Sequence, residues 1–202
     1  MTLWLAPAPL VLASRSPVRR SLLEAAGIPV ESRPADIDER AVEAAAGLAD
    51  PGAVARHLAE AKAAAISSHL TDRLVLGADQ TLSLDGRRFS KPADRAAARR
   101  QLLTLGGRSH ELHSAVALVR GGTTLYRHVA VARLTMRAFS DAFLEAYLDV
   151  AGAAVCRSVG GYQLEGTGVH LFESIVGDHF TILGLPLLPL LAHLREAGHL
   201  RS

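Results

Sequence analysis

Asp79 is the residue whose type and position first suggest chemistry in this sequence. It lies in the segment 77–81, GADQT, which follows the apolar run 74–77. Such a run is typical of a buried strand, and open α/β sheets place functional sites where their strands end. A carboxylate beside an apolar strand is costly without a function or a partner, so a catalytic role is favoured over a simple turn. An aspartyl-phosphate enzyme would need a second aspartate where this chain has Thr81.

The segment 14–20, SRSPVRR, is the first basic candidate. It follows a short apolar run, and Ser16 and Pro17 have the residue types of a helix N-cap and first helical position. Free backbone N–H groups at a helix start attract anions, and arginine grips phosphate with two parallel hydrogen bonds. The segment therefore fits a phosphate site. An ordinary capped helix with solvated arginines is the alternative.

Two lysines are further candidates. Lys62 lies one turn after Leu58 in a helix that we expect to start at Asp50 and Pro51, so it projects beside the apolar stripe of that helix. Its side chain either extends to the surface or points into a cleft that binds phosphate. Lys91, in the segment SKP, follows a predicted hairpin and by itself says little.

Two polar segments complete the candidates. The segment 36–39, DIDE, holds three carboxylates in four residues, which suits a hard cation or a solvated acidic loop. The segment 160–166, GGYQLEG, combines glycines that permit close backbone approach with Glu165, a polar group for reading a ligand. A flexible loop is the alternative there. His110 and His113 would point to opposite faces of a strand, which argues against a shared metal.

Composition narrows the class of protein. Of the 202 residues 49% are hydrophobic, enough for a substantial core, and the net charge is only +2 although the pI is about 9.0. Scattered basic residues argue against stable binding of nucleic acid. Cys156 is the only cysteine, which excludes an intramolecular disulfide and favours the cytoplasm. No apolar stretch reaches the roughly 20 residues that span a membrane, so no membrane association is expected.

The predicted elements alternate early and become a meander later. Strands are expected over 10–13, 74–77, 81–84, 87–90, 110–119, 124–136 and 169–175. Helices are expected over 16–27, 94–106, 140–150 and 185–197, and a further helix is expected to begin at residue 50. Asp85 and Gly86 have the residue types of a hairpin turn. This pattern predicts an α/β fold around a mixed sheet flanked by helices, with residues 1–202 as a single domain.

Taken together, the candidate segments resemble the Maf family of nucleotide pyrophosphatases. The resemblance runs nearly end to end and rests on eight collinear segments: LASRSPVRRSLLEAAGI, DIDER, LAEAKA, LGADQTLSLDG, SKP, GGRSHELHSAVAL, GGYQLEGTGVHLFESIVGD and ILGLPLLPLL. It implies a two-lobed α/β fold with a cleft across an elongated, twisted sheet. It also implies a divalent metal, Mg²⁺ or Mn²⁺, and hydrolysis of a nucleoside triphosphate between its α- and β-phosphates.

The resemblance assigns roles to individual residues. Ser14 and Arg19 fall on the phosphate-binding start motif, which also contains Arg20. Lys62 and Lys91 fall on two phosphate lysines. Glu39 falls on the metal-binding acidic residue. Asp79 falls on the catalytic base, and we expect it to share the metal with Glu39.

Subgroups of the family differ at the positions of Val18, Gln80 and Glu165. Gln80 and Glu165 resemble the type that acts on 7-methyl-GTP, whereas Val18 matches neither that type nor the dTTP/UTP type. A 7-methyl-GTP-like substrate is therefore expected, with a dTTP/UTP-type enzyme as one alternative. A nucleotide-binding regulator of cell division without catalysis is the other. The oligomeric state, including a homodimer, is left open.

Overall fold

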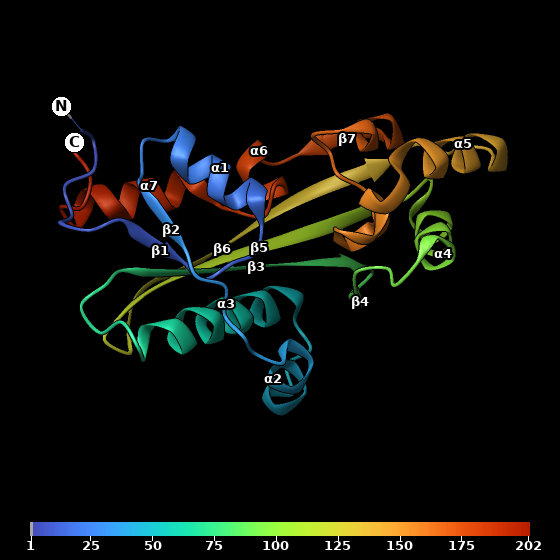
Figure 1. The fold of residues 1–202 in the computed structure, drawn as a ribbon. Helices are drawn as coiled ribbons and strands as arrows, with labels where there is room; N and C mark the ends of the chain where they lie inside the picture. Colours follow the sequence, from blue (N-terminus) through green and yellow to red (C-terminus); the bar gives the residue numbers. More distant parts are fainter. Residues whose placement is uncertain (1) are drawn as a thin grey trace. The chain divides into compact units, whose positions relative to one another are not determined.

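The computed structural model describes residues 2–202, and Figure 1 shows its helices and strands in chain order. The strands are β1 (Leu10–Leu12), β2 (Val30–Ser32), β3 (Val75–Leu84), β4 (Arg87–Phe89), β5 (Ser109–Arg120), β6 (Thr123–Met136) and β7 (Phe172–Val176). The helices are α1 (Pro17–Ala25), α2 (Glu39–Ala46), α3 (Pro51–Ser67), α4 (Arg95–Leu105), α5 (Asp141–Ala151), α6 (His179–Ile182) and α7 (Leu187–Glu196). Short 3₁₀ turns cover η1 (Gly152–Cys156), η2 (Val159–Gly161) and η3 (Thr167–Leu171).

Within residues 2–202 the strands form one seven-stranded mixed sheet. Its order is β2-β1-β3-β5-β6-β7, and β4 pairs with β3 off this path. Strand β1 is parallel to β2 and β3, whereas β4 and β7 are antiparallel to β3 and β6. The expected α/β architecture with a mixed sheet flanked by helices is therefore confirmed.

The chain divides into two compact units. The first comprises residues 1–80, 114–130 and 179–202, and the second comprises residues 81–113 and 131–178. Strands β3, β5 and β6 contribute residues to both units.

In the first unit, α1 and α7 cover one face of the strands and α3 covers the other (Figure 1). The alternation of side chains along β1 explains this layering: Leu10 and Leu12 pack with α1 and α7, whereas Val11 and Ala13 pack with Ala63 of α3. The same alternation along β3 sends Leu76 and Ala78 toward α1 and α7, and Asp79 toward α3. Successive residues of β3 therefore serve different faces.

In the second unit, α4 and α5 each bury a row of leucines, including Leu102, Leu105, Leu144 and Leu148. Ion pairs join the exposed sides of these two helices. Arg99 Nε lies 2.6 Å from one carboxylate oxygen of Glu145, and Arg95 Nη2 lies 3.0 Å from the other.

The local start and turn signals are confirmed. Ser16, Asp50, Asp94 and Ser140 each cap a helix with the side-chain oxygen, which accepts from a backbone N–H three residues later. Asp85 and Gly86 both have positive φ, of 50° and 77°, as a two-residue hairpin turn requires.

Two expectations about elements were wrong, and a third was correct for most of its residues. The two strands expected over 74–77 and 81–84 are one continuous strand, β3, so Asp79 lies in the middle of a strand rather than at its end. The acidic segment 36–39, for which a loop was one alternative, has no regular structure over 36–38 and enters helix α2 at Glu39, with Asp38 as the N-cap. The strand expected over 169–175 begins only at Phe172, because residues 169–171 belong to the 3₁₀ turn η3.

Candidate functional site

Three charged side chains of the first unit meet at the Lys62 ammonium group. Lys62 Nζ lies 2.6 Å from Asp79 Oδ1 and 2.9 Å from Glu39 Oε1. Lys62 comes from α3, Asp79 from β3 and Glu39 from the first turn of α2. The lysine and the aspartate are buried, at 8% and 7% exposure, whereas the Glu39 side chain is 54% exposed. The structure thus gathers two acidic residues and one basic residue that the sequence separates.

Gly77 permits this meeting. A Cβ atom at this position would lie 2.0 Å from the carbonyl oxygen of Ala59 and 2.9 Å from the backbone nitrogen of Ala63, both on α3. The absence of a side chain therefore lets α3 pack directly on β3. Lys62 and Asp79 follow Ala59 and Gly77 along these two elements, so the close approach brings their side chains together.

The buried carboxylate experiences opposing influences. Burial raises the pKa of Asp79, because a charged group loses hydration, while the nearby Lys62 and Arg19 act to lower it. Burial is the largest influence, and the net direction is upward. Asp79 is thus a carboxylate whose proton affinity is raised while cations still stabilise its charged form, as a proton acceptor in a reaction requires.

Arg19 connects the start of α1 to β3 and to the turn after α6. Its Nε donates to Gly184 O at 2.8 Å, and its Nη1 donates to Ala78 O at 2.8 Å and to Ser14 Oγ at 3.3 Å. Burial lowers the pKa of Arg19, and the negative charges of Asp79 and Glu39 oppose that change. The guanidinium remains charged at neutral pH, as arginine does generally in proteins.

The basic segment 14–20 borders a hollow of about 300 Å³ in the first unit. Its lining includes Ser14, Arg15, Ser16 and Arg20. Hydroxyl groups, two arginines and the N-terminus of α1 therefore surround one volume, a composition that favours an anion.

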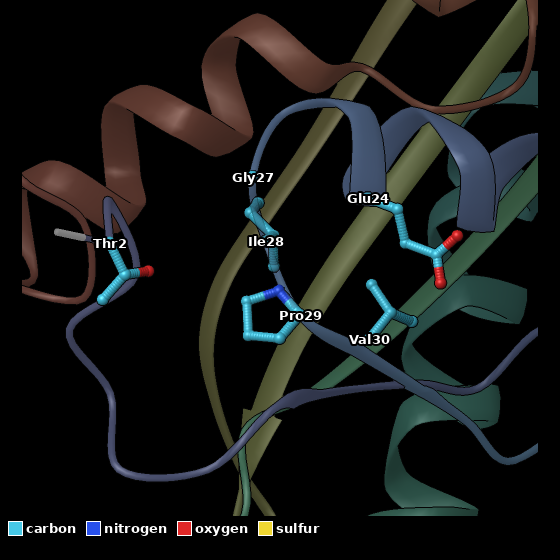
Figure 2. A pocket seen from close by; sticks show the side chains of 6 residues that line it. All are labelled: Thr2, Glu24, Gly27, Ile28, Pro29 and Val30. Carbon is cyan, nitrogen blue, oxygen red and sulfur yellow. The ribbon is translucent and has the colours of Figure 1, made fainter.

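A second hollow, of about 360 Å³, has a different character (Figure 2). It is lined by Thr2, Glu24, Gly27, Ile28, Pro29 and Val30. Its charged side chain is the Glu24 carboxylate, which accepts from Arg20 Nε at 2.7 Å. A carboxylate beside apolar groups repels phosphate, so this hollow is unsuited to a nucleotide despite its greater volume.

The other predicted residues of the first unit lie in varied surroundings. Arg20 forms its exposed ion pair with Glu24 on the outer side of α1, and Val18 is half-buried on the same helix. Gln80 is half-buried on β3, and its amide donates to groups of the first unit itself.

The acidic segment does not act as one cluster. Asp36 is fully exposed and lies 3.8 Å from Arg15, and Asp38 caps α2 through Ala41 N. Glu39 alone among these three carboxylates contacts Lys62. Throughout residues 2–202, histidine, cysteine and acidic side chains form no group of three or more that could hold a metal. Of the two alternatives for this segment, the exposure of Asp36 and the capping role of Asp38 favour the solvated acidic segment over a cation site built from all three carboxylates.

Lys91 and Glu165 belong to the second unit, and both are exposed. Lys91 lies between β4 and α4, and Glu165 lies in the glycine-rich segment before η3. Glycines in this segment and just after it lie close to neighbouring residues. A Cβ at Gly160 would lie 2.7 Å from Leu82 and Tyr162 side-chain atoms, and one at Gly168 would lie 2.3 Å from Gln163 O. These two glycines therefore accommodate the protein itself rather than a ligand.

Buried polar contacts also fix this segment. Tyr162 Oη lies 2.7 Å from His110 Nε2, and Tyr147 Oη donates to Gly161 O at 3.0 Å. Tyr162 also contacts Phe172 edge-on, with ring centroids 4.8 Å apart. His110 therefore serves the glycine-rich segment, which is consistent with the argument against a shared His110–His113 metal site.

Ser83, His113 and Glu111 superficially suggest a hydrolytic triad. Ser83 Oγ lies 3.1 Å and Glu111 Oε2 lies 3.3 Å from His113, but both contact the same ring nitrogen, Nε2. A triad requires the acid and the nucleophile on opposite nitrogens. This group therefore lacks the geometry for nucleophilic catalysis.

Three residues that contribute to the site were not predicted from the sequence. Gly77, Ser114 and Gly184 contribute through a missing side chain, a hydroxyl and a carbonyl, none of which has a distinctive local signal. Gly77 alone offered a hint, because a glycine inside an apolar strand pattern often marks a close backbone approach.

The fold and this geometry define an α/β protein whose first unit brings the carboxylates of Asp79 and Glu39 to the Lys62 ammonium group, with Glu39 in the first turn of α2. Residues 9–197 match the family described as Maf-like protein, and the chain belongs to this family.

Individual relatives carry more specific names. The chain is 63% identical over 196 residues to the nucleoside triphosphate pyrophosphatase of Rhodopseudomonas palustris, with 97% of each chain covered. It is 54% identical over 193 residues to the 7-methyl-GTP pyrophosphatase of Mesorhizobium japonicum, with 94% of this chain and 96% of the relative covered. Among solved structures, a HAM1 protein from Coxiella burnetii is 16% identical with a TM-score of 0.45, over 63% of this chain and 72% of that chain.

The described residues include no helix that is both long and apolar enough to cross a membrane.

Proposed function

We propose that this protein is a nucleoside triphosphate pyrophosphatase. The observation that carries the proposal is the buried Asp79 carboxylate held by Lys62, whose ammonium also contacts Glu39. A protein that merely bound phosphate would need the cations, whereas exposed or buried carboxylates at the same place would repel its ligand. The names of the relatives in Rhodopseudomonas palustris and Mesorhizobium japonicum support the same activity.

The arrangement suits a divalent cation. Glu39 and Asp79 each direct one carboxylate oxygen at the same Lys62 nitrogen, so the two carboxylates converge. Mg²⁺ prefers oxygen ligands and commonly binds one or two carboxylates together with phosphate oxygens of the substrate. We propose that Glu39 and Asp79 hold Mg²⁺ or Mn²⁺, which supplies charge neutralisation and polarises the phosphoryl group.

Residues of the chain supply the remaining functions. The start of α1 and the Arg19 guanidinium bind and orient the phosphates, and we propose that Lys62 and Lys91 provide further positive charge. Asp79 accepts a proton from the attacking water, which requires that it contact the metal indirectly or that a second metal be bound, because a carboxylate bound directly to a metal is a poor base. The water oxygen bonds to the α-phosphorus, the bond to the bridging oxygen breaks, and pyrophosphate leaves from the nucleoside monophosphate. Lys62 keeps Asp79 oriented before the reaction and stabilises its charge.

The activity is tested by incubating the protein with a triphosphate and a coupling inorganic pyrophosphatase, and then measuring phosphate. We expect release with Mg²⁺ or Mn²⁺ and none with excess EDTA. Nucleotide analysis should show the monophosphate. Nucleotide binding without turnover, with every substrate and metal tried, would instead support the alternative of a non-catalytic regulator.

For the substrate, we propose a guanine-type base and favour 7-methyl-GTP. Guanine presents two adjacent donors, N1–H and the exocyclic amine, and the Glu165 carboxylate offers two acceptors. Uracil and thymine present one donor flanked by carbonyl oxygens, so a carboxylate would face an acceptor at a cost of roughly 1–3 kcal/mol. Methylation makes guanine cationic, which increases its attraction to Glu165. The 7-methyl-GTP pyrophosphatase relative supports this assignment.

The base preference is tested by comparing kcat/KM for 7-methyl-GTP, GTP, UTP and dTTP in the native protein and in Glu165→Gln. We expect the native protein to prefer the guanine nucleotides, and the variant to lose about 10-fold of that preference. A native preference for UTP or dTTP would favour the dTTP/UTP-type alternative. An unchanged ranking in the variant would remove Glu165 from base recognition.

A further inference from the structure

The segment 179–184, which contains α6 and the turn after it, is held by side chains from three other elements of the first unit. Gln80 Nε2 lies 3.2 Å from Thr181 O and 3.0 Å from Ile182 O. Ser114 Oγ donates to Thr181 O at 2.7 Å. Arg19 Nε donates to Gly184 O at 2.8 Å. Carbonyls at 181, 182 and 184 thus fasten one short segment to β3, β5 and α1.

The surroundings of Gln80 fix the orientation of its amide. A backbone carbonyl only accepts hydrogen bonds, so the amide nitrogen must face Thr181 and Ile182. Since Ser114 uses its hydrogen on Thr181 O, its oxygen accepts from Gln80 Nε2 at 2.9 Å. Three acceptors therefore share the two hydrogens of this nitrogen. The amide donor group of Gln80 is occupied by the protein itself.

Arg19 links the segment 179–184 to the residues around Asp79. The guanidinium that binds Gly184 O also donates to Ala78 O, on the residue before Asp79. Among the described residues these bonds engage Nε and Nη1, so Nη2 is the part of the fork left for an anion. A Cβ at Gly184 would lie 3.1 Å from Nη2, which shows how closely the turn borders that group.

We propose that Gln80 and Ser114 are positioning residues for Arg19. They fix the carbonyls at 181 and 182, so that Gly184 O holds the guanidinium with Nη2 directed to polyphosphate. This inference rests on the proposed function of the same site. It assigns Gln80 an effect on every triphosphate, whatever the base.

A ligand without a base tests the inference. Calorimetry with inorganic tripolyphosphate in magnesium buffer should show binding about 10-fold weaker for Gln80→Met, which keeps the length of the side chain but removes its donors. The kcat/KM values for 7-methyl-GTP, GTP, UTP and dTTP should fall by a similar factor and keep their order. Arg19→Lys, which removes the fork, should weaken tripolyphosphate binding by at least about 10-fold.

A double-mutant cycle separates positioning from general damage to the fold. If Gln80 acts through Arg19, Gln80→Met should change tripolyphosphate affinity by less than about 2-fold in the Arg19→Lys background. Equal effects in both backgrounds would overturn the inference. If Gln80→Met does not fold, Ser114→Ala, which removes one bond to the same segment, takes its place in every measurement.

The remaining outcomes are distinguishable. If Gln80→Met changes the order of the four nucleotides and leaves tripolyphosphate binding intact, then Gln80 contacts the base and the inference is wrong. If Arg19→Lys weakens tripolyphosphate binding but Gln80→Met and Ser114→Ala do not, the inference fails while the proposed function stands. If Arg19→Lys itself has no effect, the proposed phosphate role of Arg19 fails as well.

Discussion

Asp79 in the first compact unit and His110 in the second are both buried titratable groups, but their partners differ in charge. Asp79 contacts the Lys62 ammonium at 2.6 Å, whereas His110 contacts the Tyr162 hydroxyl at 2.7 Å. Burial lowers the pKa of His110 to about 4 and raises that of Tyr162, so this pair is neutral at pH 7. The buried pair in the first unit is thus made of two opposite charges, whereas the buried pair in the second unit is neutral.

This difference separates two roles for buried polar groups. A buried ion pair contributes little net stability, because the loss of hydration offsets the attraction between the charges. Its presence beside a helix start therefore favours chemistry over stability as an explanation. A neutral hydrogen-bonded pair fixes backbone position, and here it fastens the glycine-rich segment that carries Glu165.

The largest expected effect is the loss of turnover in Asp79→Asn. The asparagine keeps the shape but loses the negative charge and the basicity, so kcat should fall at least ~10²-fold. Circular dichroism should show an intact fold. Glu31→Gln is the matched control, because Glu31 is also an ion-paired carboxylate of the first unit, bound to Arg33 and Arg73, and lies outside the proposed site. Near-native kcat in Asp79→Asn would remove Asp79 from catalysis.

Gly77→Ala should show that the charged cluster depends on close packing. The new Cβ would lie 2.0 Å from Ala59 O, so α3 must move away from β3 and separate Lys62 from Asp79. We expect unfolding free energy to fall by about 3 kcal/mol, at the upper end for overpacking, and kcat to fall about 10-fold. Gly47→Ala is the control, because a Cβ there meets no atom within 4 Å and only the positive φ is strained. Equal losses of kcat in the two variants would contradict the packing argument.

Gly77 also marks the limit of what the sequence could predict. Caps, turns and hairpins depend on neighbouring residues, which explains why Ser16, Asp50 and the turn at Asp85 were predicted correctly. The sequence left open whether Lys62 extends to the surface or points into a cleft. Its side chain is buried, because its environment depends on a strand that lies 13 or more residues away in the chain. The family resemblance predicted that Glu39 and Asp79 share a metal, but the contact of both with Lys62 was not predicted, because no local pattern encodes contacts between distant elements.

The unfolding free energy of the protein should depend on pH through His110, the titrating member of the neutral His110–Tyr162 pair. The folded pKa of about 4 lies below the ordinary value of 6.5, so between these values the unfolded chain binds a proton that the folded chain excludes. The contribution of this group to stability is therefore complete above pH 6.5, declines as the pH falls toward 4, and is then constant. One pKa unit corresponds to about 1.4 kcal/mol, so the loss is roughly 3 kcal/mol.

Urea unfolding followed by circular dichroism at several pH values measures this loss. Carboxylates titrate over the same range in any variant, so the comparison must be made with His110→Gln, which lacks the titrating ring. The native protein should lose roughly 3 kcal/mol more than His110→Gln between pH 7 and pH 4. Parallel pH curves for the two proteins would show that His110 is not kept neutral by burial.

The smallest expected effect concerns replacement of the neutral pair by apolar side chains. Tyr162→Phe leaves His110 Nε2 without its buried partner, and His110→Leu leaves the Tyr162 hydroxyl without one, so each should cost about 1–3 kcal/mol of unfolding free energy. The double variant removes both polar groups together. It should therefore cost less than the sum of the singles by about 1 kcal/mol, because no buried group is left unpaired.

The same cycle at the charged pair sharpens the contrast. In Lys62→Met combined with Asp79→Leu, apolar packing replaces the buried charges, so stability should recover in part relative to Lys62→Met alone, which leaves an unpaired carboxylate. Activity should not recover at all, because the reaction needs the carboxylate itself. In the double variant His110→Leu and Tyr162→Phe, by contrast, kcat should fall only to the extent that the protein loses stability. If the double apolar variant at the neutral pair folds well but lacks activity, the His110–Tyr162 pair has a chemical role, and the division between the two clusters is wrong.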